Sequence, residues 1–101
     1  MSSLTQHEEH HHDHDVEVTV RTPAGASHPF RFELNELAAR AAATAIGYFI
    51  KKNEIGPGDY ALELIRDGQP TPIADTSRLG DYGLRDGDQL HLITAKPQVD
   101  G

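Results

Sequence analysis

The side chains best suited to chemistry cluster near the start of the chain. Residues 1–15 read MSSLTQHEEHHHDHD and hold five of the seven histidines, together with four acidic residues. Imidazoles mixed with carboxylates suit Zn²⁺, Ni²⁺ or Cu²⁺. A specific metal site, however, needs ligands held in a fixed geometry, and a segment this polar buries too little apolar surface to order itself. We therefore expect a disordered tail over residues 1–15, with only weak and nonspecific metal binding by His10, His11, His12 and His14.

The remainder of the chain shows no catalytic constellation. His28 precedes a proline in a predicted loop and has no evident partner, while His91 lies within a predicted strand. Catalysis by serine, histidine and aspartate requires three such residues around one pocket. A domain of this size leaves little room for a pocket behind its core. We therefore expect that the protein is not an enzyme and carries no cofactor of its own.

Composition narrows the remaining classes. The chain has 101 residues, no cysteine and a formal charge of −7. The lack of cysteine excludes disulfides and thiolate chemistry, and the negative charge argues against nucleic-acid binding. No apolar run approaches the ~18–20 residues of a membrane span, and the first residues lack the segments of a signal peptide. We expect one small cytoplasmic domain that is monomeric and binds neither nucleic acid nor membrane.

Hydrophobic periodicity predicts the elements that would position a site. Alternating apolar residues predict strands over residues 16–21, 29–34, 60–66, 71–73 and 89–94. The alanine-rich stretch from Leu37 to Ile50 predicts one long helix whose apolar stripe faces the sheet. Asn35 is suited to cap this helix, and Gly47 inside it suggests a close packing contact. Asp67 and the glycine after it predict a hairpin turn, and a short helical turn is expected within residues 75–84.

These elements follow one another in the order β-β-α-β-β-turn-β. A hairpin, a crossover helix and further strands give an α+β domain, with a mixed four- to five-stranded sheet packed on one long helix. The other face of the sheet stays open to solvent or partners. We place this domain at residues 16–95, between the tail of residues 1–15 and a flexible C-terminal tail of residues 96–101. The order is that of the β-grasp arrangement.

The second half of the domain resembles ubiquitin. Residues 79–84, LGDYGL, are similar to the Leu-Ser-Asp-Tyr-Asn-Ile segment of ubiquitin, and residues 90–93, LHLI, to its Leu-His-Leu-Val strand. The strand and turn at residues 62–69, LELIRDGQ, look like the third strand of ubiquitin and the turn after it, and residues 54–59 link helix to strand as ubiquitin does. The resemblance covers roughly residues 16–95, and it implies a ubiquitin-like β-grasp fold.

The resemblance also implies a partner-binding patch on the open sheet face. Ile65, His91 and Ile93 correspond to the isoleucine, histidine and valine of the recognition patch of ubiquitin. Ala24 falls near the loop position that holds a leucine in ubiquitin, so this contact is smaller. The alternative interpretation is that the two isoleucines are scattered surface residues, which are common in soluble proteins.

The C-terminus is the second site that the resemblance implies. Gly101 matches the terminal glycine whose carboxylate an activating enzyme adenylates with ATP, although a single glycine after Asp100 replaces the usual glycine pair. Lys51 and Lys52 are candidate acceptors for chain formation, and they also suit the negative C-terminal end of the helix.

The function implied is that of a bacterial ubiquitin-like protein modifier. Its partners would be activating and conjugating enzymes, a deconjugating protease and protein targets, as in bacterial operons of this kind, some of which are linked to antiviral defence. Two alternatives stay open. One is a non-covalent β-grasp adaptor that binds through its sheet face, and the other is a sulfur carrier with a C-terminal thiocarboxylate. A β-grasp fold alone does not decide among them.

Overall fold

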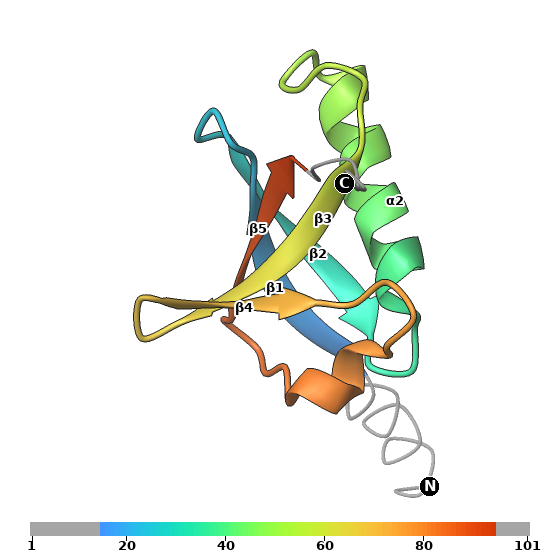
Figure 1. The fold of residues 1–101 in the computed structure, drawn as a ribbon, viewed down its shortest axis with the longest axis vertical. Coiled ribbons are helices and arrows are strands. Elements are labelled where there is room, and N and C mark those ends of the chain that lie inside the picture. The colour runs from blue at the N-terminus through green and yellow to red at the C-terminus, as the bar shows by residue number, and fades with distance from the viewer. Residues whose placement is uncertain (1–14, 95–101) are drawn as a thin grey trace, which may run out of the picture.

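In the computed structural model, which describes residues 15–94, helix α2 packs across one face of a five-stranded mixed sheet (Figure 1). The strands are β1 (Asp15–Arg21), β2 (Ser27–Glu33), β3 (Tyr60–Arg66), β4 (Gln69–Ile73) and β5 (Gln89–Thr94). Helix α2 (Ala38–Lys51) joins β2 to β3, and the 3₁₀ helix η1 (Leu79–Tyr82) precedes β5. The predicted α+β class and element order are confirmed.

The strands lie in the order β2-β1-β5-β3-β4. The first and last strands, β1 and β5, run parallel at the centre, with Val20 opposite Leu90, while every other neighbouring pair is antiparallel. Strands β2 and β4 therefore form the two edges. Strands β3 and β5 have the predicted bounds, whereas β1 begins one residue earlier than predicted and β2 two residues earlier.

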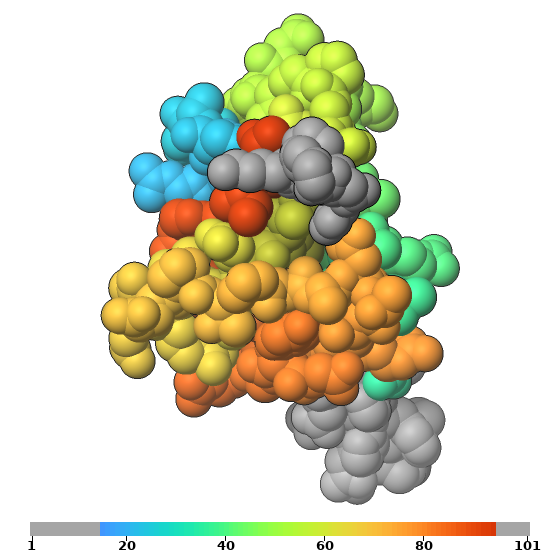
Figure 2. Space-filling model, in the orientation of Figure 1, coloured from blue at the N-terminus to red at the C-terminus, as the bar shows by residue number. Residues whose placement is uncertain are grey.

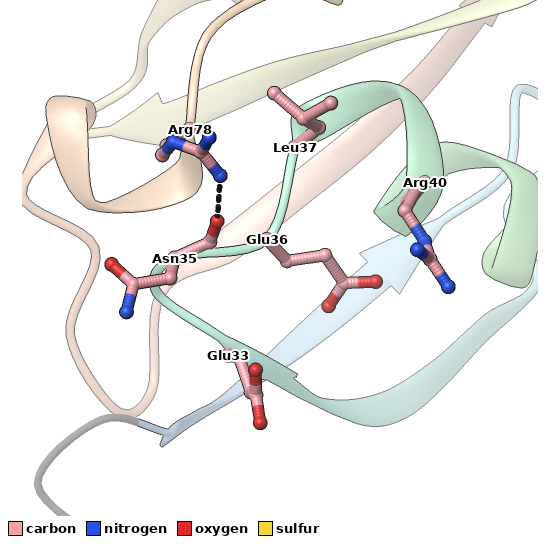
Figure 3. Close-up of a pocket in the computed structure, with 6 residues that line it drawn as sticks. All are labelled: Glu33, Asn35, Glu36, Leu37, Arg40 and Arg78. Carbon is pink, nitrogen blue, oxygen red and sulfur yellow. Dashed lines mark hydrogen bonds between the residues drawn. The ribbon is translucent and has the colours of Figure 1, made fainter.

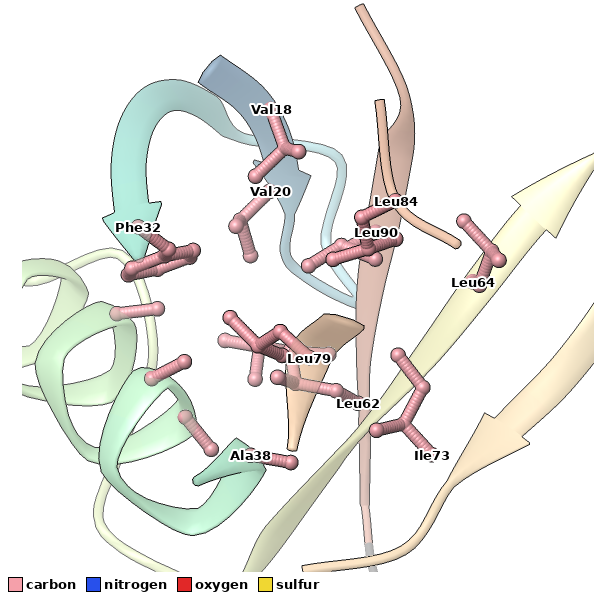
Figure 4. Close-up of a cluster of buried hydrophobic side chains, with 14 of the residues drawn as sticks. Val18, Val20, Phe32, Ala38, Leu62, Leu64, Ile73, Leu79, Leu84 and Leu90 are labelled. Carbon is pink, nitrogen blue, oxygen red and sulfur yellow. The ribbon is translucent and has the colours of Figure 1, made fainter. Parts of the chain in front are cut away.

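The core lies between the sheet and α2 (Figure 4). Inward side chains alternate along the strands as predicted, and the largest fully buried ones are Val18, Val20, Phe49, Leu62, Leu79, Leu90 and Leu92. Most of the residues that helix α2 contributes to this core are alanines: Ala38, Ala41, Ala42 and Ala45. Because alanine has no atoms beyond Cβ, the helix packs close to the sheet over its first turns, while Phe49 fills the space near its end.

The start of α2 differs from the prediction. Leu37, not Asn35, occupies the N-cap position, and no side chain caps the helix. The N–H of Ala38 instead donates to the Ser77 carbonyl at 2.8 Å, and that of Ala39 to the Asp75 carbonyl at 3.2 Å. Backbone carbonyls from the segment after β4 therefore satisfy two of the N–H groups that a helix start leaves free. The sequence around the start of the helix does not predict these partners, because Asp75 and Ser77 lie more than 30 residues further along the chain.

The predicted apolar stripe of α2 is too wide at both ends. Leu37 is 36% exposed and Ile50 is 40% exposed. Their chain neighbours Ala38 and Phe49 are buried, so both ends of α2 contact the core, and Leu37 and Ile50 lie on the solvent side of it. The packing contact suggested for Gly47 is also absent from the described structure, since a Cβ built there has no neighbour within 4 Å.

One turn and the side-chain contacts of Arg66 fix the end of the sheet where β3 meets β4. Asp67 and Gly68 form the predicted hairpin turn, with φ angles of 54° and 76°. A turn with both central residues in the left-handed region matches the twist of the strands it joins. Arg66 donates to the Asp88 carboxylate at 2.5 Å and to the Gly83 carbonyl at 3.2 Å, which ties the end of β3 to the loop before β5.

Tyr82 fastens the end of η1 to the segment after β4. Its hydroxyl hydrogen-bonds with Ser77 Oγ at 3.4 Å and accepts from the Ala74 N–H at 3.0 Å. These two hydrogen bonds, that of Ser77 first, lower the pKa of Tyr82. Tyr82 thus holds in place the segment whose carbonyls cap α2.

Candidate protein-binding surface

The face of the sheet that α2 leaves uncovered carries the three residues predicted as a patch. Ile65 on β3 and His91 and Ile93 on β5 are all half-buried, and they alternate with inward-facing Leu64 and Leu92. Since successive side chains of a strand point to opposite faces, the three share the outer face.

No helix in the described range is long and apolar enough to cross a membrane.

The strand register separates the two isoleucines. His91 lies opposite Glu63, whereas Ile93 lies opposite Ala61 and Ile65 opposite Gln89. A charged and ionisable pair, Glu63 and His91, therefore stands between the two isoleucines. The outer face carries two small apolar areas on either side of this pair.

A shallow depression of about 470 Å³ joins one of these areas to the β1–β2 loop. Its wall on the β1 side runs from Arg21 through the loop, and its wall on the β5 side is formed by residues 91–94. In Figure 2 the loop and the end of β5 adjoin on the same surface. The depression thus brings together Ala24, His91 and Ile93, but not Ile65. We call it the loop–β5 groove.

Two residues of this surface were missed by the sequence analysis. Glu63 faces His91 from β3, and Arg21, which lines the groove, is the partner of His91 on β1. The alternation of each strand places both side chains on the outer face. The register between strands, which the sequence does not specify, places the acidic Glu63 on one side of His91 and the cationic Arg21 on the other.

The other predicted site residues lie elsewhere. Lys51 ends α2, and Lys52 follows it with its Nζ 5.6 Å from the centre of the Tyr48 ring. The two lysines are thus distinguished by a cation–π contact. Gly101 and the histidines of residues 1–14 lie outside the described residues. Within residues 15–94, no three histidine or acidic side chains gather as a metal-binding group.

A second depression, of about 440 Å³, lies beside the start of α2 (Figure 3). It is lined by Glu33, Asn35, Glu36, Leu37, Arg40 and Arg78. Arg78 donates to the Asn35 carbonyl at 2.5 Å, which holds the segment before η1 against the β2–α2 loop. Two acids and two arginines balance each other here, so the charge of these side chains favours no particular ion.

Many solved structures are similar to this chain, and three of them cover most of its length. One is titled as the architecture of tubulin-binding cofactor B from Trypanosoma brucei, with a TM-score of 0.65 and 22% identity, covering 83% of this chain and 99% of that one. Another is a protein designed on ubiquitin, with a TM-score of 0.58, 16% identity and coverage of 87% and 98%. A third is the ubiquitin of Caldiarchaeum subterraneum, with a TM-score of 0.56, 22% identity and coverage of 82% and 96%.

The fold is that of ubiquitin. The ubiquitin-like β-grasp arrangement expected from the sequence motifs is therefore confirmed, and the chain forms a ubiquitin-like module. At these identities the likeness establishes the fold alone. No protein-family model matches the chain, and no curated protein matches it significantly.

Proposed function

We propose that this ubiquitin-like module is a protein modifier of bacterial type that docks its partner enzymes at the loop–β5 groove. The observation that carries the proposal is the convergence of Ala24, His91 and Ile93 on one groove whose wall also includes Thr94. Residues 95–101 follow directly from Thr94. An enzyme bound at the groove therefore lies beside Thr94, the residue from which the chain continues to Gly101.

The chemistry proposed is transfer of the Gly101 carboxyl group. An activating enzyme adenylates the carboxylate with ATP and releases pyrophosphate. Its cysteine thiolate then displaces AMP to form a thioester, which a conjugating enzyme passes to an amine of the target. A deconjugating protease reverses the attachment. This chain has no cysteine, so the thioester sulfur must come from the partner. We further propose that the module itself is not an enzyme.

The test is incubation of the full chain with ATP and an activating enzyme encoded beside it, followed by mass spectrometry under non-reducing conditions. A thiol-sensitive adduct between the enzyme and Gly101 is expected. Deletion of Gly101 should abolish it, and Ile93→Arg should weaken it by about tenfold because a charge enters the groove. The matched control is Ile50→Arg, an exposed isoleucine at the end of α2. Adduct formation that survives the Gly101 deletion would contradict the proposal.

A non-covalent adaptor is the second candidate. It is favoured by the groove that the described residues 21–25 and 91–94 line, since a partner can bind there without any reaction at the C-terminus. For an adaptor, deletion of Gly101 would leave partner binding unchanged, whereas Ile93→Arg would still weaken it. The same two variants therefore separate the two functions.

A further inference from the structure

The two edges of the sheet differ in what they offer another strand. On β4, Pro70 lies opposite Ile65 and Pro72 opposite Glu63. The two-residue turn makes Arg66 and Gln69 a hydrogen-bonded pair, so alternate residues of β4, the two prolines, direct their backbone groups away from β3. Because proline has no N–H, this edge lacks the donors that an added strand would need.

Within residues 15–94, the outer edge of β2 pairs with no other strand, and it keeps its donors. Thr19 N–H donates to the Asp88 carbonyl at 3.1 Å, and the Glu17 carbonyl accepts from the Gly87 N–H at 2.9 Å. These two residues of β1 thus direct their backbone groups away from β2. Their partners on β2, Pro29 and Arg31, must direct theirs to the open side. Glu33 does the same by alternation, so Arg31 and Glu33 present both N–H and C=O.

The side chains on this edge carry opposite charges that could pair with the same residues of a second copy. Arg31 and Glu33 are both exposed and lie two residues apart on the outer face. Glu33 also lies opposite Asp15 on β1, a like-charged pair that is unfavourable across two strands. A cation placed on the open side of Glu33 would relieve this repulsion.

We propose that β2 is a self-association surface, and that a second copy of this chain pairs with it antiparallel, with Arg31 of each copy opposite Glu33 of the other. A twofold axis at Phe32 then relates the copies. Each Arg31–Glu33 pair exchanges both backbone hydrogen bonds and adds an ion pair. The Glu33 carbonyl already accepts from the Glu36 N–H at 3.0 Å, and its second lone pair remains for the new bond.

The neighbouring registers are less favourable. A shift that centres the axis on Arg31 places the two arginines opposite each other and sets Glu33 opposite Pro29, which has no N–H to give. In the proposed register Phe30 instead faces Leu34 of the second copy. Both are only partly buried against the core of their own chain, so pairing would cover apolar surface as well.

The loop–β5 groove stays open in this dimer. Strand β1 lies between β2 and β5, and the copies join at the outer side of β2. The result is a continuous sheet of two modules that presents two copies of the groove. The monomer expected from the sequence is then the form at low concentration, since so short an interface gives weak association.

Charge reversal tests the proposal. The full chain is studied by sedimentation velocity from about 10 µM to about 1 mM, a range suited to weak association. Arg31→Glu and Glu33→Arg each place like charges opposite one another, and either should raise the dissociation constant by about tenfold or more. The double reversal restores opposite charges and should return the dissociation constant to near that of the wild type. Circular dichroism confirms that each variant is folded.

A mixture of the two single variants gives a second, independent readout. One chain then carries two acids on the edge and the other two arginines, so a heterodimer should form where neither variant associates alone. Wild-type chain that stays monomeric at about 1 mM would overturn the proposal. Variants that associate as well as the wild type, or a mixture that remains monomeric, would also overturn it.

Discussion

Glu63 on β3 lies directly opposite His91 on β5, on the sheet face that α2 does not cover. This pair separates Ile65 from Ile93 and divides the apolar surface that the sequence motifs predict as one patch. The groove beside Ile93, rather than a patch centred on Ile65, is therefore the part of this face with the shape of a binding site.

Replacing the acid of this pair should join the two apolar areas. In Glu63→Ile, three isoleucines would run diagonally across β3 and β5, so retention on a hydrophobic-interaction column should increase. Glu17→Ile makes the same change on β1, away from both isoleucines, and serves as the control. Equal retention of the two variants would show that the isoleucines do not form a continuous surface even without the acid.

Gly47→Ala should stabilise the protein. Gly47 lies inside α2 with no atom near the position of a Cβ, and alanine is the better helix former by roughly 0.5–1 kcal/mol. The free energy of unfolding, measured by urea denaturation, should rise by about that amount. A loss of stability would mean that the helix surface at Gly47 is more crowded than its surroundings indicate.

Gly80→Ala should have the opposite effect. A Cβ at this position would lie 3.2 Å from the Leu34 carbonyl oxygen and 3.4 Å from the Leu34 Cβ. The Gly80 N–H donates to that same carbonyl at 2.8 Å, so η1 cannot move away without losing the bond. We expect a loss of about 1–3 kcal/mol in the free energy of unfolding. Comparison with Gly47→Ala under identical conditions removes any general effect of added methyl groups.

Asp88→Ala should destabilise the region around the loop before β5. The Asp88 carboxylate accepts from Arg66 and, at 2.9 Å, from the Arg85 N–H, and its side chain is only 14% exposed. Its removal leaves the Arg85 N–H without this partner and leaves Arg66 with the Gly83 carbonyl alone, at a cost of about 1–3 kcal/mol. The exposed Asp59 provides the control, because Asp59→Ala removes the same charge from a surface site. If both changes cost the same in thermal unfolding, the Arg66–Asp88 contact contributes nothing specific.

Truncation of a buried and of an exposed leucine should have different effects on stability. Leu79 on η1 is fully buried, and Leu79→Ala should cost about 2–5 kcal/mol because it leaves a cavity in the core. Leu37 was predicted on the buried stripe but is exposed, so Leu37→Ala should cost less than about 1 kcal/mol. Similar losses for the two in urea denaturation would mean that Leu37 is covered in solution.

The sequence predicted those features that depend on local pattern. The alternation of Leu62 and Leu64 placed β3 with correct bounds, and Asp67 and Gly68 specified their turn through the φ angles they tolerate. What could not be predicted depends on partners distant in the chain. The cap of α2 comes from Ser77 and Asp75, and the separation of Ile65 from Ile93 comes from the register of two strands that lie far apart in sequence.

The parallel pairing of β1 with β5 governs how the chain can assemble. Until residues 89–94 have been synthesised, β1 with β2 and β3 with β4 are two hairpins with no strand between them. The strand made last fills the middle of the sheet, and contacts between such distant segments slow folding. On the ribosome this domain therefore cannot close its sheet until translation has passed Thr94 and the exit tunnel has released β5, so a nascent chain stalled before that point should remain open to proteases and chaperones.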